Sequence, residues 1–137
     1  MEQKEYYMKQ ALKEAEKAYK KLEVPVGAVI VKDGKIIARA HNQKETKTDT
    51  TKHAEILAIQ KASKKLKSWR LIDCEMYVTL EPCSMCKEII KKSRISDIYY
   101  LSKQNEEQKD AINNYEYIEK KYFSDLLTTF FKEKRRK

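Results

Sequence analysis

The spacing of apolar residues and the length of the chain together predict an α/β domain. Apolar residues at three- and four-residue steps alternate with short apolar runs, in the order helix, strand, strand, helix, strand, helix, strand. The length of 137 residues suits one domain, and the two glycines and two prolines form no linker. We therefore expect a single domain over residues 1–137.

The first half of the chain predicts a helix followed by a hairpin. Residues 5–22 have the pattern of an amphipathic helix, and residues 24–31 form a near-continuous apolar run that indicates a buried strand. The Asp-Gly pair at 33–34 favours a type I′ turn, so residues 35–41 are expected to return as a second strand. The polar residues 43–52 predict a loop.

The second half predicts alternating helices and strands. A helix is expected over residues 53–66 and a strand over 75–80, with Met76 and Val78 on one face. A short helix should follow at 83–92, and a fourth strand at 95–101. In that short helix, Met85, Ile89 and Ile90 are expected to point inward.

The remaining residues show weaker patterns. After a polar stretch over 102–110, residues 115–118 suggest a short edge strand, and residues 122–131 return to helical spacing. Residues 132–137 are strongly basic, which suits the C-terminal end of a helix.

Composition and charge limit the classes of function. The net charge of +9 favours a polyanionic partner, although a lysine-rich surface can also serve solubility alone. Three cysteines, two of them in a metal-binding spacing, indicate a reducing compartment. The N-terminus lacks an apolar signal region and no segment is apolar enough to span a membrane, so we expect a cytoplasmic protein without membrane contact.

A zinc site is indicated by His53 together with Cys83 and Cys86. One imidazole and two thiolates fill three positions of a tetrahedral Zn²⁺ ion and leave the fourth open for water, which is typical of catalytic sites. Glu55 lies two residues after His53, where it is suited to accept a proton from that water. The sequence therefore predicts one zinc ion per subunit, with Glu55 as the catalytic base.

Two other interpretations of the cysteine pair remain. A structural zinc site would need a fourth protein ligand, for which Cys74 and His41 are the candidates, and a redox pair is the third possibility. Cys74 is also expected to pack as a small apolar residue. Trp69 is expected in the core or at a dimer interface.

Several stretches of the chain together match the motifs of one family. They are Glu23-Val24-Pro25-Val26-Gly27-Ala28-Val29, Asn42, His53-Ala54-Glu55, Arg70-Leu71-Ile72-Asp73, Tyr77-Val78-Thr79-Leu80-Glu81-Pro82-Cys83, Met85-Cys86 and Ser93-Arg94-Ile95. In these stretches the chain resembles the bacterial tRNA-specific adenosine deaminases of the cytidine deaminase-like superfamily. The His-x-Glu and Pro-Cys-x-x-Cys elements are common to zinc-dependent base deaminases. The chain departs from the family after Leu101, where residues 101–107 replace a Gly-Ala-Arg-Asp-like run and are shortened.

The resemblance implies a three-layer α/β/α cytidine deaminase-like fold with a mixed sheet of about five strands, and a homodimer. It implies hydrolytic deamination of adenosine to inosine at the wobble position of tRNA by a zinc-activated water. Asn42 is expected to contact the flipped nucleoside, and the backbone of Ala54 to meet the base.

The C-terminal residues are candidates for RNA contact. Aromatic rings can stack on bases, and basic side chains can bind phosphates; these residues are Phe130, Phe131, Lys132, Lys134, Arg135 and Arg136. Two alternative functions remain. One is deamination of a free base or nucleoside such as guanine, cytosine or cytidine, and the other is a non-catalytic, zinc-stabilised RNA-binding module.

Overall fold

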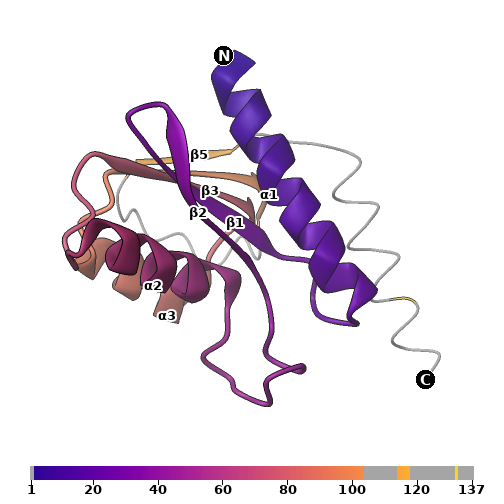
Figure 1. The fold of residues 1–137 in the computed structure, drawn as a ribbon. Coiled ribbons are helices and arrows are strands. Elements are labelled where there is room, and N and C mark those ends of the chain that lie inside the picture. Colours follow the sequence, from indigo (N-terminus) through magenta and orange to yellow (C-terminus); the bar gives the residue numbers. More distant parts are fainter. Residues whose placement is uncertain (1, 104–113, 118–131, 133–137) are drawn as a thin grey trace.

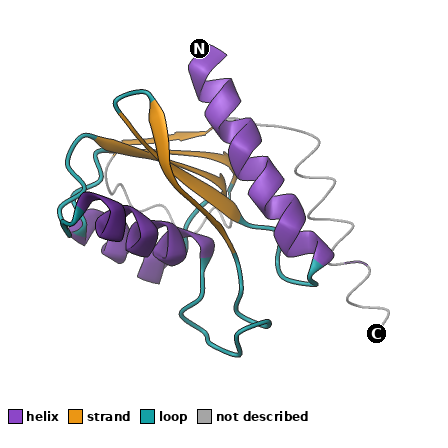
Figure 2. Cartoon of the chain, viewed as in Figure 1, coloured by secondary structure: helices purple, strands orange, loops and turns teal. Residues whose placement is uncertain are grey.

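The chain folds into three layers, with a β-sheet between helices (Figures 1 and 2). The computed structural model describes residues 2–103, 114–117 and 132. The elements are α1 (Glu2–Lys20), β1 (Gly27–Lys32), β2 (Lys35–His41), α2 (Ala54–Leu66), β3 (Cys74–Leu80), α3 (Ser84–Lys92), β4 (Asp97–Ser102) and β5 (Asn114–Tyr117). Helix α1 covers one face of the sheet, and α2 and α3 cover the other (Figure 1). The predicted α/β/α architecture is confirmed.

The strands form one mixed sheet in the order β2-β1-β3-β4-β5. Strand β1 is antiparallel to both β2 and β3, whereas β3, β4 and β5 run parallel to one another. Because β2 and β3 are both antiparallel to the strand between them, their carboxyl ends lie at the same edge of the sheet. Open α/β sheets commonly bind ligands at such an edge.

The hairpin between β1 and β2 has the predicted turn. Asp33 and Gly34 both have positive φ, 51° and 74°, as a type I′ turn requires. Asp tolerates this conformation better than most residues, and Gly adopts it without steric cost. The turn thereby fixes the register in which Lys32 pairs with Lys35.

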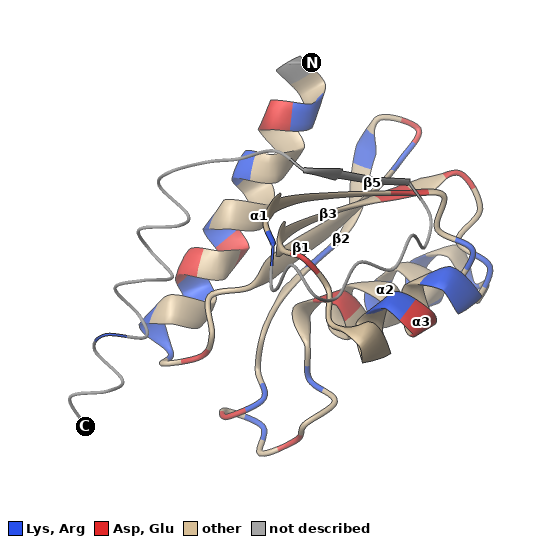
Figure 3. Ribbon diagram, turned by 180° about the vertical axis from the view of Figure 1, so that it is seen from behind, with Lys and Arg blue, Asp and Glu red and all other residues tan. Residues whose placement is uncertain are grey.

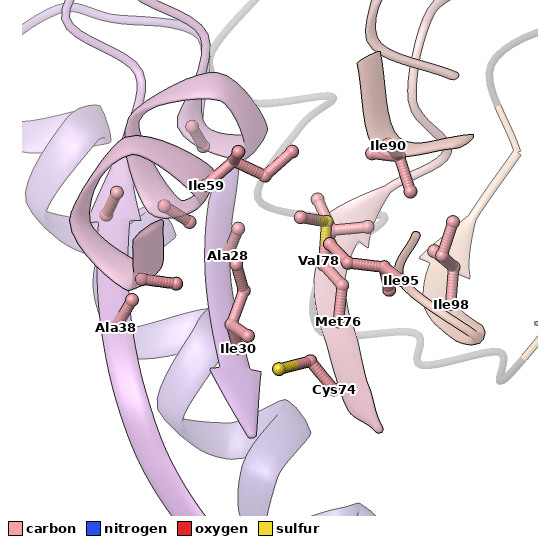
Figure 4. Packing of buried hydrophobic residues seen from close by; sticks show 14 of the residues in the cluster. Ala28, Ile30, Ala38, Ile59, Cys74, Met76, Val78, Ile90, Ile95 and Ile98 are labelled. Atoms are coloured by element: carbon pink, nitrogen blue, oxygen red, sulfur yellow. The ribbon is translucent and has the colours of Figure 1, made fainter. Parts of the chain in front are cut away.

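Apolar side chains pack on both faces of the sheet. Figure 4 shows Ile30, Met76, Val78, Ile90 and Ile98 among those between the sheet and helices α2 and α3. A second cluster fills the space between the sheet and α1; its buried members are Tyr7, Met8, Ala11, Leu12, Ala15, Val29, Val31, Tyr77, Tyr99 and Leu101. The predicted core role of Cys74 is confirmed, since its side chain is fully buried in the first cluster.

One predicted inward position is wrong. Met85 is 42% exposed, because α3 turns Cys86, Lys87 and Ile90 toward the interior and leaves Met85 on its outer side. Trp69 is 54% exposed, so the core alternative for this residue is wrong, and the dimer-interface alternative stays a prediction. The Arg70 guanidinium lies 4.4 Å from the centre of its ring.

The predicted helix over residues 122–131 lies outside the described residues. Most of the segment over 101–107 that departs from the family, and the basic end apart from Lys132, also lie outside them. Among the described helices, none has the length and apolar character needed to cross a membrane.

A buried carboxylate, that of Glu14, joins α1 to the end of β2. Glu14 is 3% exposed, its Oε1 lies 3.1 Å from His41 Nδ1, and its Oε2 accepts a hydrogen bond from Lys17 Nζ at 2.8 Å. Burial alone would raise the pKa of Glu14, but the hydrogen bonds and charges of His41 and Lys17 outweigh it and lower the pKa to about 2. This carboxylate holds the residue that immediately precedes Asn42.

Replacing Glu14 by Gln is expected to remove stability in a pH-dependent manner. Because its folded-state pKa lies below the ordinary value of 4.5, Glu14 stabilises the fold above pH 4.5, and this contribution is lost as pH falls toward 2. The stability difference between the two proteins should be about 3 kcal/mol at pH 6 and roughly half of that at pH 3. Urea unfolding at both pH values measures it. Glu5→Gln, an exposed change on the same helix, should show no such trend.

Candidate functional site

The candidate site lies at the edge where β2 and β3 end. Asn42 follows β2, His53 is the N-cap of α2, and Cys83, three residues after β3, is the N-cap of α3. Neither cap side chain forms a capping hydrogen bond, so both remain available for a ligand. The dipoles of two helix starts favour negative charge here.

The structure brings the three predicted metal ligands together. The ligand atoms of His53, Cys83 and Cys86 all lie within 4.8 Å of one another, and His53 Nδ1 is 3.6 Å from Cys86 Sγ. Zinc bonds of about 2.3 Å to sulfur and about 2.0–2.1 Å to nitrogen, at a tetrahedral angle, place these two atoms about 3.5 Å apart. The donor set therefore fits a Zn²⁺ ion with little movement.

The pKa values of the two thiols are shifted in opposite directions. A hydrogen bond from Cys86 is the largest influence on Cys83; burial opposes it, but the pKa of Cys83 still falls to about 5. The same hydrogen bond, together with burial, raises the pKa of Cys86. Since a coordinated thiol is deprotonated outright, zinc binding would release the proton of the Cys86 thiol.

The two candidates for a fourth protein ligand lie elsewhere. His41 Nδ1 contacts Glu14, and the Cys74 thiol is buried in the core, 3.8 Å from the carbonyl oxygen of Ile72. Within the described part of the chain, the group of possible ligands contains only His53, Cys83 and Cys86. A three-ligand site favours a catalytic centre over a structural one.

Glu55 lies in the first turn of α2 and is 4% exposed. Burial is the main reason why its pKa is raised to about 7, and negative charge on Cys83 adds to the rise. A carboxyl group with a pKa near 7 can both accept and donate a proton at cellular pH, as a general acid–base catalyst must.

A cavity of about 180 Å³ opens beside these groups. Its lining residues are Val24, Val26, Asn42, Lys44, His53, Glu55, Leu80, Glu81 and Cys83. The Oδ1 atom of Asn42 accepts the backbone N–H of Ala54 at 2.8 Å. This hydrogen bond orients the amide of Asn42 and occupies the N–H of Ala54, so that Asn42 is the better placed of the two to contact a ligand.

The sequence did not indicate that Glu81 lines the cavity and pairs with a buried lysine. Glu81 lines the cavity, and its carboxylate is 2.9 Å from Nζ of Lys87, whose side chain is 2% exposed. Its position directly before Pro82-Cys83 was a local signal that it lies near the metal ligands, but the pairing with Lys87 depends on the turn into α3. The predicted RNA-contacting residues 130–136 lie outside the described residues except Lys132, which the structure does not bring to this cavity.

A family model and several relatives match this chain. The model is described as the cytidine and deoxycytidylate deaminase zinc-binding region and matches residues 1–102. A tRNA-specific adenosine deaminase of Aquifex aeolicus is 43% identical over 145 residues, which cover 96% of both chains. A tRNA-specific adenosine deaminase of Bacillus subtilis is 52% identical over 100 residues, covering 73% of this chain and 62% of the relative.

Solved structures show the same similarity. A structure from work on A-to-I editing by tRNA:A34 deaminases at the wobble position of transfer RNA superposes with a TM-score of 0.75 and 35% identity, covering 82% of this chain and 96% of the other. A guanine deaminase from Bacillus subtilis superposes with a TM-score of 0.71 and 37% identity, covering 80% and 71% of the two chains.

Proposed function

We propose that this chain, which belongs to the family defined by the cytidine and deoxycytidylate deaminase zinc-binding region, converts adenosine to inosine at the wobble position of tRNA. The single observation that carries the choice of substrate is the 43% identity to the Aquifex aeolicus tRNA-specific adenosine deaminase over 96% of both chains. The chemistry is supported independently by a three-ligand metal centre next to a buried carboxyl group.

His53, Cys83 and Cys86 would hold the zinc ion, which supplies Lewis acidity that makes a coordinated water ionise near neutral pH. Glu55 accepts the proton of the attacking water at its carboxylate. It passes this proton to N1 of adenine as the water oxygen bonds to C6. It then takes the proton of the hydroxyl group now on C6 and delivers it to the 6-amino group, so that the C6–N bond breaks and ammonia leaves. The raised pKa of Glu55 suits both transfers.

The cavity would receive the base after it has turned out of the anticodon stack. Val24, Val26 and Leu80 supply apolar surface for the ring, and the Asn42 amide is held by its bond to Ala54. Extrusion of the base is less costly in a single-stranded loop than in a duplex, which suits an anticodon as substrate.

We further propose that the protein acts as a homodimer in the cytoplasm. The exposed ring of Trp69 is suited to an interface. The proposed tRNA substrate supports a cytoplasmic location. Light scattering of the purified protein would test the dimer.

The decisive assay uses the purified, zinc-loaded protein and an anticodon stem-loop RNA with adenosine at the wobble position. Mass spectrometry of the digested RNA should detect inosine at that position, with no inosine from an otherwise identical RNA in which adenosine lies elsewhere in the loop. RNA binding without inosine would instead favour a non-catalytic, zinc-stabilised module.

A second candidate function is deamination of guanine. The 37% identity to the Bacillus subtilis guanine deaminase, with a TM-score of 0.71, favours it. Ammonia release from guanine, cytosine, cytidine and free adenosine should be measured in parallel. Release from guanine without inosine in the RNA would replace the proposed function by this one.

A further inference from the structure

The carboxylate of Glu23 is buried against the loop of residues 43–52, called here the β2–α2 loop. Glu23 is 1% exposed. Its Oε1 accepts the backbone N–H of Glu45 at 3.0 Å, and its Oε2 accepts the N–H and hydroxyl of Thr46 at 2.5 and 2.6 Å. A buried carboxylate is stable only when donors compensate its charge, so these contacts tie the loop to Glu23.

The backbone of Glu23 is itself held by the end of α1. Leu22 adopts the left-handed conformation, with φ 63°. The N–H of Glu23 bonds to the carbonyl of Ala18 at 2.9 Å, and that of Leu22 to Tyr19 at 3.0 Å. These are the two hydrogen bonds of a Schellman motif, which places Glu23 at a defined point beyond the helix.

Residues of the candidate site flank the β2–α2 loop on both sides. Asn42 precedes it and His53 follows it, and the N–H of Gln43 bonds to the carbonyl of Lys52 at 2.9 Å across the neck. Lys44, near the start of the loop, lines the cavity. In Figure 1 the loop extends beyond the edge of the sheet where the helices α2 and α3 begin.

The loop carries basic side chains that a nucleic acid could meet. Lys44 and Lys47 are exposed, whereas Lys52 is half-buried and its Nζ lies 3.9 Å from Asp49 Oδ2. The loop also carries Glu45, and Figure 3 shows both blue and red segments along it. Lysine side chains bind phosphates without reading base sequence, and such contacts position a strand. A free base has no phosphates and would not use them.

We propose that Glu23 is a positioning residue for an RNA substrate: its carboxylate holds the β2–α2 loop so that Lys44 and Asn42 receive the strand at the mouth of the cavity. This inference rests on the proposed function, since it assigns an RNA role to a loop beside the same site. Glu23 acts through the loop and does not touch the reacting base.

The test compares Glu23→Gln with the unaltered protein. Gln keeps one acceptor oxygen and turns an NH₂ group toward a donor of the loop. The KM and Kd for the anticodon stem-loop should rise about tenfold, because misplacement of binding groups is costly, whereas kcat at saturating RNA and the zinc content should not change. Amide hydrogen exchange at Glu45 and Thr46 should become faster. Glu5→Gln makes the same change of charge on an exposed part of α1 and should alter none of these quantities.

Three results would overturn the inference. They are unchanged KM, Kd and exchange in Glu23→Gln; a loss of kcat without a change in KM; and faster exchange with unchanged RNA affinity. If the unaltered protein binds the stem-loop but forms no inosine, the proposed function fails, and the ratio of the two Kd values together with amide exchange still tests the role of Glu23.

Discussion

Glu55→Gln is expected to lower the rate of deamination by about 10²–10⁴-fold while leaving the zinc content unchanged. Gln has nearly the shape of Glu, so it fills the same buried position, but its amide cannot accept a proton from water or deliver one to a base. Because Glu55 is outside the group of three metal ligands, the metal site should remain intact. Single-turnover kinetics on the stem-loop RNA and zinc analysis measure the two effects.

Glu88→Gln is a matched control for this experiment. Glu88 lies on α3 and is exposed, so its replacement changes the net charge equally without entering the cavity. Its rate should equal that of the unaltered protein. Near-normal turnover by Glu55→Gln would exclude Glu55 as the proton carrier, and loss of zinc would show that it supports the metal instead.

The candidate site could be predicted from sequence because its chemistry is concentrated in two short motifs. His53 and Glu55 are two residues apart, and the two cysteines are three apart, so local spacing already restricted their roles. Their convergence follows from the sheet, in which β2 and β3 end at one edge. The Asp-Gly turn predicted the first of these strands, and the alternation at Met76 and Val78 predicted the second.

Contacts between distant residues could not be predicted in this way. The bonds of Glu23 to the β2–α2 loop span 22 and 23 positions, and that of His41 to Glu14 spans 27. The spacing of apolar residues indicates which face of a helix or strand is buried, but it does not indicate which single charged residues are buried there. Met85 was predicted to point inward from apolar spacing, whereas the buried residues of α3 are Cys86, Lys87 and Ile90, one of them charged.

Gly27 also contacts a segment that is distant in the sequence, because α1 crosses β1 directly over it. A Cβ atom at Gly27 would lie 2.1 Å from the carbonyl oxygen of Ala11 and 2.4 Å from the backbone nitrogen of Ala15. Both are backbone atoms, so no side-chain rotation can relieve the overlap. The N–H of Gly27 also donates to Thr79 Oγ1 at 3.1 Å, beside the edge of the sheet that carries the site.

Gly27→Ala is therefore expected to destabilise the fold by about 3 kcal/mol or more, because α1 must move away from the sheet and lose packing along its buried face. Gly34→Ala is the matched control. A Cβ at Gly34 meets nothing within 4 Å, so that change should cost only the strain of its positive φ, about 1–2 kcal/mol. Urea unfolding of both variants measures the difference, and equal losses would contradict the close approach of α1. Since Val26 lines the cavity one residue away, Gly27→Ala should also weaken substrate binding under conditions in which it remains folded.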